Sequence, residues 1–120
     1  MITGLHILAA STDPVADRAF LRDILGWSFV EDTGSGPGWL IFKTPVTELG
    51  VHPAAENSGA ELYLMCDDLD ATIAELSAKG VVTGEVRDAR FGRLTSIALP
   101  SGASLGLYQP SHALAITLEG

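Results

Sequence analysis

The sequence predicts an α+β fold built from two tandem βαβββ modules. The expected order of elements, one strand, one helix and three strands, occurs twice within 120 residues. Equivalent residues also keep a nearly constant offset, because Asp13 and Asp68 are 55 residues apart and Gly50 and Gly106 are 56 residues apart. Each module would form a four-stranded sheet with its helix on one face. The two sheets would face each other, or pair with those of a second chain, and form a U-shaped or half-barrel sheet around a cavity. The chain would be a single domain spanning residues 1–120.

The first module is expected over residues 2–52 and begins with an apolar strand over residues 2–10. A helix follows, because Asp13 is a typical N-cap, Pro14 suits the first helical position and Gly26 suits the helix end. Helical spacing places four apolar residues in one core-facing stripe: Val15, Ala19, Phe20 and Ile24. The other strands of this module are expected at residues 27–32, 39–44 and 47–52.

A linker over residues 53–59 leads to the second module, residues 60–110, in which the same order starts again. Its helix would begin at Asp67 or Asp68 and end at Gly80. Three apolar residues of this helix would turn inward: Leu69, Ile73 and Leu76. The strands of this module are expected at residues 61–67, 81–89, 93–100 and 104–110.

The tail, residues 111–120, lies outside both modules. Apolar side chains alternate along it, which is a strand pattern that could cap an open sheet edge or pack across a dimer. His112, at the start of this tail, is expected on the surface.

The composition limits the classes of partner. A net charge of −8 argues against nucleic-acid binding, which needs a basic surface, and it is compatible with a cationic or neutral ligand or with solubility alone. No apolar run reaches the ~18 residues that a membrane helix needs. The N-terminus does not resemble a signal peptide, because no Lys or Arg precedes its short apolar run. Cys66 is the single cysteine, so no internal disulfide can form, which fits the reducing cytoplasm.

Three segments carry a resemblance to a known family: DPVADRAFLRDILGW in the first module, and CDDLDATIAELSAKGV and FGRLTSIALPSGASLGLYQP in the second. On these segments, the chain resembles the vicinal oxygen chelate superfamily of glyoxalases, bleomycin-resistance proteins and extradiol dioxygenases, over about residues 4–110. The resemblance implies the βαβββ repeat, a cavity lined by the inner sheet faces and, commonly, a homodimer. It is less specific for activity, because the superfamily includes lyases, isomerases, dioxygenases and drug-binding proteins.

The resemblance also implies where a metal would bind. The ligand positions of the family lie on the first and last strand of each module, and they correspond here to His6, Glu61, Gly50 and Gly106. Glutamate is usual at the last-strand positions of metal-dependent members, and glycine offers no side-chain oxygen in its place. Zn²⁺, Ni²⁺, Mn²⁺ and Fe²⁺ sites need at least three protein ligands, so we expect an incomplete site and no cofactor.

An alternative metal site remains open in the sequence. His52 would lie on the same strand face as Gly50, so it could join His6 and Glu61 in a displaced two-histidine, one-carboxylate site for one of these divalent metals. Without a metal, His6 would line the cavity or bond to a neighbour. Glu61 would be an exposed residue at the start of its strand, or an acid that meets a cationic ligand.

Six residues are candidates for contact with a ligand: Trp39, Gly50, His52, Tyr63, Gly106 and Tyr108. The two glycines would widen the cavity floor and let a ligand approach the backbone, or would mark a bulge in each last strand. The aromatic rings would stack on the ligand, although aromatic residues in alternating strands are most often part of the core. Tyr63 would share a strand face with Glu61, and Trp39 follows a glycine-rich loop.

Two functions follow from these observations. The first is a protein that binds a small aromatic or cationic molecule between its modules, without an intact metal site. The second is a metal-dependent lyase, isomerase or dioxygenase acting on a substrate with vicinal oxygens, with the metal as Lewis acid. We favour the first, because one relocated histidine does not replace two missing carboxylates.

Overall fold

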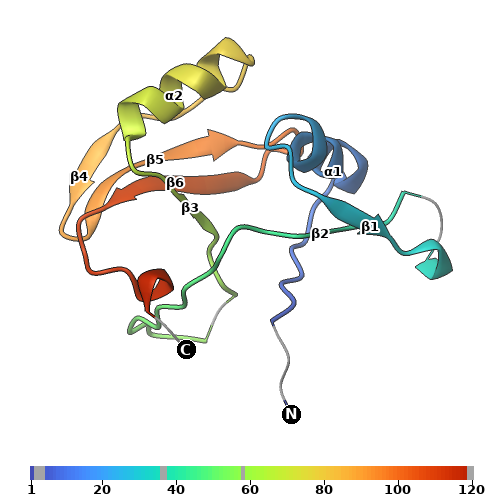
Figure 1. Cartoon of the computed structure of the whole chain (residues 1–120), viewed down its shortest axis with the longest axis horizontal. Helices are drawn as coiled ribbons and strands as arrows, with labels where there is room; N and C mark the ends of the chain where they lie inside the picture. The colour runs from blue at the N-terminus through green and yellow to red at the C-terminus, as the bar shows by residue number, and fades with distance from the viewer. Residues whose placement is uncertain (2–4, 36–37, 58, 119–120) are drawn as a thin grey trace.

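The computed structural model describes residues 1, 5–35, 38–57 and 59–118. Its main element is a four-stranded mixed sheet with helix α2 (Leu69–Ala78) on one face (Figure 1). A separate two-stranded sheet and helix α1 (Pro14–Asp23) belong to the first half of the chain (Figure 1). The predicted α+β fold class is confirmed.

Both helices begin and end as the sequence predicts. The carboxylate of Asp13 accepts a hydrogen bond from the Ala16 amide at 3.2 Å, and that of Asp68 accepts one from the Ala71 amide at 3.0 Å. The structure therefore selects Asp68 over Asp67 as the second N-cap. Past each helix the chain turns through a glycine with positive φ, Gly26 at +72° and Gly80 at +80°, which is the conformation that favours glycine.

The four strands of the larger sheet come from the second module in the spatial order β3-β6-β5-β4. Strand β3 (Tyr63–Met65) pairs in parallel with β6 (Ser104–Pro110), which pairs antiparallel with β5 (Gly92–Ala98). Strand β4 (Arg87–Ala89) completes the sheet at the other edge of β5. This strand is shorter than the predicted strand over 81–89, and Thr83 forms only an isolated bridge to Ile97.

The hydrophobic core lies between this sheet and the helices. In the register, Ile97 pairs with Leu105 and Thr95 with Leu107, so these side chains share one face of the sheet. That face packs against the helices, and the buried core consists of Phe20, Leu69, Leu76, Ile97, Leu105 and Leu107. The alternate residues Gly106 and Tyr108 therefore lie on the opposite face, which we call the open face.

The predicted stripe of α1 is only partly buried. Phe20 is in the core and Ile24 packs at its edge, but 73% of Val15 is exposed. In α2, Leu69 and Leu76 are buried and Ile73 is partly buried, as predicted.

Among its described residues, the first half of the chain contains fewer strands than the sequence predicts. Strands β1 (Phe29–Glu31) and β2 (Leu40–Phe42) form a hairpin, with the 3₁₀ turn η1 (Thr33–Ser35) between them. Residues 5–10 and 47–52 are not in strands, and residues 2–4 of the predicted first strand lie outside the described residues. A strand needs a neighbouring strand to satisfy its main-chain hydrogen bonds. Neither of these two segments pairs with another strand, so neither forms one.

The tail does not form the predicted strand in the part of it that the structure describes. Its residues form a 3₁₀ turn, η2 (Ala115–Thr117), and the carboxylate of Glu48 accepts hydrogen bonds from the amides of Ala115 and Ile116. These amides are thereby satisfied by a side chain rather than by a strand. Within the described ranges, no helix has the length and apolar character needed to span a membrane.

Candidate functional site on the open sheet face

Aromatic rings from two strands and a turn meet on the open face. The ring of Tyr108 is edge-on to Tyr63, with centroids 5.8 Å apart, and to Phe91, with centroids 5.7 Å apart. We call Tyr63, Phe91 and Tyr108 the aromatic cluster. Tyr63 is 41% exposed and Phe91 is 43% exposed, so this face presents apolar ring surface to solvent.

The structure explains why residue 106 is glycine. Tyr63 and Gly106 are partners in the register of β3 and β6, and a Cβ atom at residue 106 would overlap the Tyr63 ring. The space above Gly106 is therefore occupied by Tyr63 rather than left open for a ligand. Gly50 differs, because a Cβ built there would have no atom within 4 Å.

Two carboxylates and one histidine border the aromatic cluster. The Tyr63 hydroxyl donates a hydrogen bond to Glu61 at 3.1 Å, and the Tyr108 hydroxyl lies 3.1 Å from Nε2 of His112. The same Nε2 atom lies 3.7 Å from Oε1 of Glu48. The open face thus combines ring faces with two acidic groups and one titratable base.

The environment keeps both tyrosines as neutral phenols. Burial raises the pKa of Tyr63, and its hydrogen bond to Glu61 raises it further, against a smaller opposing effect of Arg87. Burial also raises the pKa of Tyr108, and the negative charge of Glu48 adds to this effect. Both hydroxyls are therefore suited to hydrogen bonding and not to accepting a proton near neutral pH.

Trp39 is not brought to the aromatic cluster. It precedes β2 in the separate hairpin, and the guanidinium of Arg18 lies 4.7 Å from the centre of its ring. A hollow of ≈ 300 Å³ lies nearby between α1 and this hairpin, and another of ≈ 240 Å³ lies where Phe20 faces Val81. Neither hollow is lined by a predicted site residue.

Two other polar residues have structural partners. Arg93 forms ion pairs with Asp70 at 3.3 Å and Asp88 at 3.7 Å, so its charge is engaged next to α2. The thiol of Cys66 lies 3.5 Å from the carbonyl oxygen of Tyr108, and burial raises its pKa, which disfavours a reactive thiolate.

Sequence reasoning placed Glu48 on the same strand face as Gly50 but gave it no role, and it placed His112 on the surface without a role. Residues 47–52 do not form the expected strand, so alternation of side chains could not identify the contact of Glu48 with the tail. His112 follows Tyr108 by four residues beyond the end of a strand, and no periodic pattern identifies such a contact.

No protein-family model matches the sequence, and no curated protein matches it. Among solved structures, an antibiotic-binding protein, TnmS3, from Streptomyces sp. CB03234 is 24% identical, with 92% of this chain and 98% of that chain covered and a TM-score of 0.66. A lactoylglutathione lyase from Agrobacterium tumefaciens is 16% identical, with coverages of 90% and 94% and a TM-score of 0.60.

A glyoxalase/bleomycin resistance protein, also from Streptomyces sp. CB03234, is 24% identical, with coverages of 82% and 93% and a TM-score of 0.53. The chain has the vicinal oxygen chelate fold. The resemblance seen in the sequence is thus confirmed at the level of the fold. Identities of this size carry the vicinal oxygen chelate architecture and not an activity.

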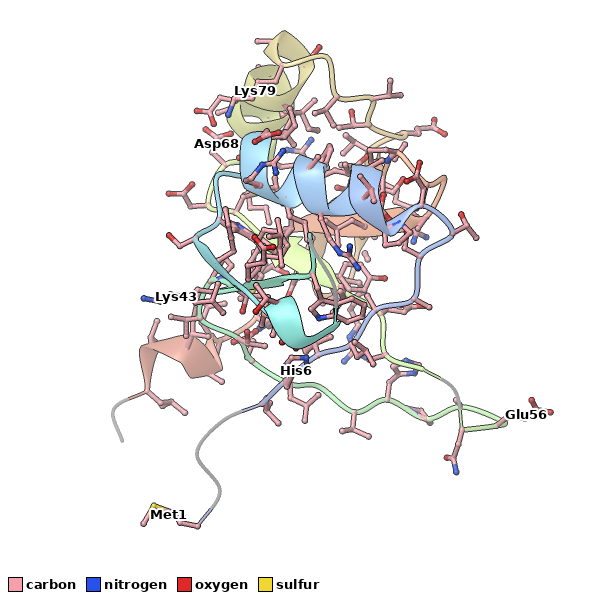
Figure 2. All side chains as sticks on the ribbon, turned by 90° about the vertical axis from the view of Figure 1, so that its right-hand side faces the viewer. Met1, His6, Lys43, Glu56, Asp68 and Lys79 are labelled. Carbon is pink, nitrogen blue, oxygen red and sulfur yellow. The ribbon has the colours of Figure 1, made fainter. Side chains whose placement is uncertain are left out.

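The predicted metal ligands of this vicinal oxygen chelate fold do not form a suitable donor set. His6 is exposed on the extended segment that leads to α1 (Figure 2), and His52 is exposed with Nδ1 3.0 Å from the Pro53 carbonyl oxygen. Glu61 bonds to Tyr63. Across the described ranges, no three His, Cys, Asp or Glu side chains form a group that could hold a metal ion.

Proposed function

We propose that this protein binds a small molecule on its open face and does so without a metal cofactor. The observation that carries the proposal is the aromatic cluster, in which Tyr63 and Phe91 present about two-fifths of their surface to solvent around Tyr108. Exposed rings in edge-to-face contact offer a large apolar surface to a flat ligand. The donor set described above is the reason for proposing binding rather than metal-assisted catalysis.

The ligand that suits this surface is aromatic and either neutral or cationic. Glu61 and Glu48 lie beside the two tyrosines, and aromatic faces attract a cation. The likeness to an antibiotic-binding protein supports a small-molecule ligand. Gly50 and His52 follow Glu48 on the same segment, and the open backbone at Gly50 supports a contact there. The predicted contacts Trp39 and Gly106 are not part of the proposed site, because Trp39 lies in the separate hairpin and the Tyr63 ring fills the space above Gly106.

Titration with an aromatic dye series tests the proposal. Acridine orange as cation and anthraquinone-2-sulfonate as anion would be titrated by calorimetry, with the expected preference for the cation. Tyr108→Ala should weaken binding about tenfold or more, because each stacked ring is worth ~0.5–1.5 kcal/mol beyond its buried area. Phe29→Ala is the matched control, since Phe29 is an exposed ring (42%) on the separate hairpin. Equal losses in both variants would contradict the site.

A metal titration distinguishes the alternative function. Protein purified without chelators would be titrated with Zn²⁺, Ni²⁺, Mn²⁺ and Fe²⁺. We expect no stoichiometric uptake. Tight uptake that is lost in His6→Ala would instead favour the metal-dependent enzyme.

We also propose that the protein is a homodimer. Its accessible surface is 9059 Å², whereas a compact monomer of 12.6 kDa exposes about 6,200 Å². Apolar side chains account for part of this excess, with Leu5 80%, Leu49 77% and Val51 91% exposed. A second copy of the chain that covers these segments would bury them.

Sedimentation tests the dimer. The wild type is expected to sediment as a dimer at micromolar concentration, and Leu49→Lys should shift it to monomer. Val82→Lys is the control, because Val82 is similarly exposed at 71% but lies in the second module. For localisation we propose the cytoplasm, where the single thiol of Cys66 would stay reduced, and cell fractionation would check this.

A further inference from the structure

The tail turns back beneath the sheet immediately after β6. The Ser111 amide donates a hydrogen bond to the Phe91 carbonyl oxygen at 2.8 Å, and the Ser111 hydroxyl donates one to the Arg90 carbonyl oxygen at 3.3 Å. One residue further on, the His112 ring lies 6.0 Å from the Tyr108 ring, centre to centre. The start of the tail is therefore fixed to two members of the aromatic cluster.

Glu48 holds the next turn of the tail from the other half of the chain. Its Oε2 atom accepts hydrogen bonds from the Ala115 amide at 2.8 Å and the Ile116 amide at 3.4 Å. These residues are 67 and 68 positions apart from Glu48, and the side chain of Glu48 is only 16% exposed. Figure 1 shows η2 on the side of the sheet away from α2, next to the segment that follows β2.

The contacts of His112 indicate which of its ring nitrogens carries the hydrogen in the neutral state. Nδ1 lies 2.7 Å from the Ala113 carbonyl oxygen, and a carbonyl can only accept, so Nδ1 carries a hydrogen. In the neutral ring, Nε2 is then an acceptor, and the Tyr108 hydroxyl donates to it at 3.1 Å. Oε1 of Glu48 lies 3.7 Å from the same Nε2, which has no hydrogen to donate to it while the ring is neutral.

Protonation of His112 changes this arrangement. Nε2 gains a hydrogen that it donates to Tyr108 or Glu48, and the ring gains a positive charge beside the carboxylate that holds η2. Tyr108 and Glu48 are the titratable groups that face His112. Beyond them, Tyr63 contacts the Tyr108 ring. Burial and Glu61 raise the pKa of Tyr63, and Arg87 lowers it.

We propose that residues 111–118 are a lid over Tyr108 of the aromatic cluster, that Glu48 holds the lid through its main-chain amides, and that protonation of His112 tightens this hold. What the lid regulates rests on the proposed function. The lid itself is tested without any ligand, so its failure and a failure to bind a small molecule are separate results.

Amide hydrogen exchange on the full chain measures the lid. Protection factors of the Ala115 and Ile116 amides would be determined by NMR at pH 5.5 and pH 8.0. In the wild type we expect ~2- to 5-fold higher protection at pH 5.5, which corresponds to a partly exposed ion pair. Glu48→Ala should abolish the protection, and Glu48→Gln should retain part of it without its pH dependence, because an amide oxygen still accepts.

Two variants complete this experiment. His112→Gln should remove the pH dependence while leaving the Glu48 contacts in place. Glu56→Gln is the control and should behave as wild type, because Glu56 is exposed at the end of an outlying loop (Figure 2). Wild-type protection in Glu48→Ala, no pH dependence in the wild type, or pH dependence that survives in His112→Gln would each overturn the proposal.

Tyrosine nitration tests whether the lid covers Tyr108. The chain contains only two tyrosines, Tyr63 and Tyr108, so modification by tetranitromethane can be assigned by mass spectrometry. Tyr108 should react several-fold faster in Glu48→Ala than in Glu48→Gln. Both variants remove the negative charge of Glu48, but only Gln keeps an acceptor for the η2 amides. A difference in rate therefore reports how well the lid covers the Tyr108 phenol. Equal rates would overturn the covering role of residues 111–118.

Discussion

Gly106 and Gly50, which the repeat in the sequence predicts to be equivalent, have different surroundings in the structure. At Gly106, the ring of Tyr63 from the neighbouring strand takes the place of a side chain. At Gly50, a Cβ atom would meet open space. One glycine therefore allows close packing of an aromatic ring on a strand, and the other leaves the backbone accessible.

Replacement by alanine should separate the two positions. Gly106→Ala forces the Tyr63 ring to move, and we expect a loss of about 1–3 kcal/mol in the free energy of unfolding, as for other overpacked sites. Gly50→Ala, the matched control, should stay within about 0.5 kcal/mol of wild type. Urea unfolding followed by circular dichroism measures both. Equal costs at the two positions would contradict the packing described for Tyr63.

At the scale of elements, the half-buried carboxylate of Asp17 links α1 to the second module. Asp17 accepts hydrogen bonds from the amide of Ser101 at 3.0 Å and from its hydroxyl at 2.7 Å, in the turn between β5 and β6. The Ser11 hydroxyl donates a third at 2.7 Å. Burial acts to raise the pKa of Asp17, but the hydrogen bonds from Ser101 and Ser11 outweigh it and hold the pKa below its ordinary value.

Asp17→Asn should destabilise the protein at neutral pH by about 1–2 kcal/mol, because the charged acceptor of these bonds is lost. A carboxyl whose pKa is lowered by folding stabilises fully above its unfolded-state pKa of about 3.9, and this stabilisation disappears as the pH falls through the folded-state value. Urea unfolding of both proteins should therefore show a clear difference at pH 7 and a smaller one below pH 3. A difference that is independent of pH would argue against the charged form of Asp17 as the cause.

The N-cap of α2 offers a second test at this scale. Asp68→Ala removes the hydrogen bond to the Ala71 amide and should cost about 1 kcal/mol in thermal or urea unfolding. Asp67→Ala serves as the control, because Asp67 is an exposed neighbour outside the helix. If Asp67→Ala proved as costly as Asp68→Ala, local charge rather than capping would explain the loss.

At the scale of the whole molecule, the two halves differ in how much of their backbone is paired. The second module forms a four-stranded sheet with a buried core, whereas the first contributes one helix and a short hairpin to the described structure. The segments at 5–10 and 46–52 expose several apolar side chains. The stability of the first half should therefore depend on what covers these segments.

Hydrogen exchange at different protein concentrations measures this dependence. In the proposed dimer, amides of residues 5–10 and 46–52 should be protected at high concentration and should exchange faster on dilution below the dissociation constant. Amides of β5 and β6 should stay protected throughout, which makes them an internal control. If dilution left residues 5–10 and 46–52 as protected as before, a second copy would not be what covers them.

The ends of both helices could be predicted from the sequence. Asp13 and Asp68 cap amides three residues away, and Gly26 and Gly80 supply positive φ at the chain turns, so short-range chemistry suffices to locate both helices. The repeat of these signals at a nearly fixed offset was sufficient to predict the α+β fold and the order of elements in the second module.

Only the tertiary structure decided the contacts between distant segments. The packing of the Tyr63 ring on Gly106 depends on the parallel register of β3 and β6. The hydrogen bond from the Ala115 amide to Glu48 joins residues 67 positions apart. Strand formation at 5–10 and 47–52 likewise depended on partners that alternation of side chains does not supply. A helix carries its hydrogen bonds within its own sequence, whereas a strand, a ring packed across strands or a side chain holding a tail obtains its partner from the way the chain is folded.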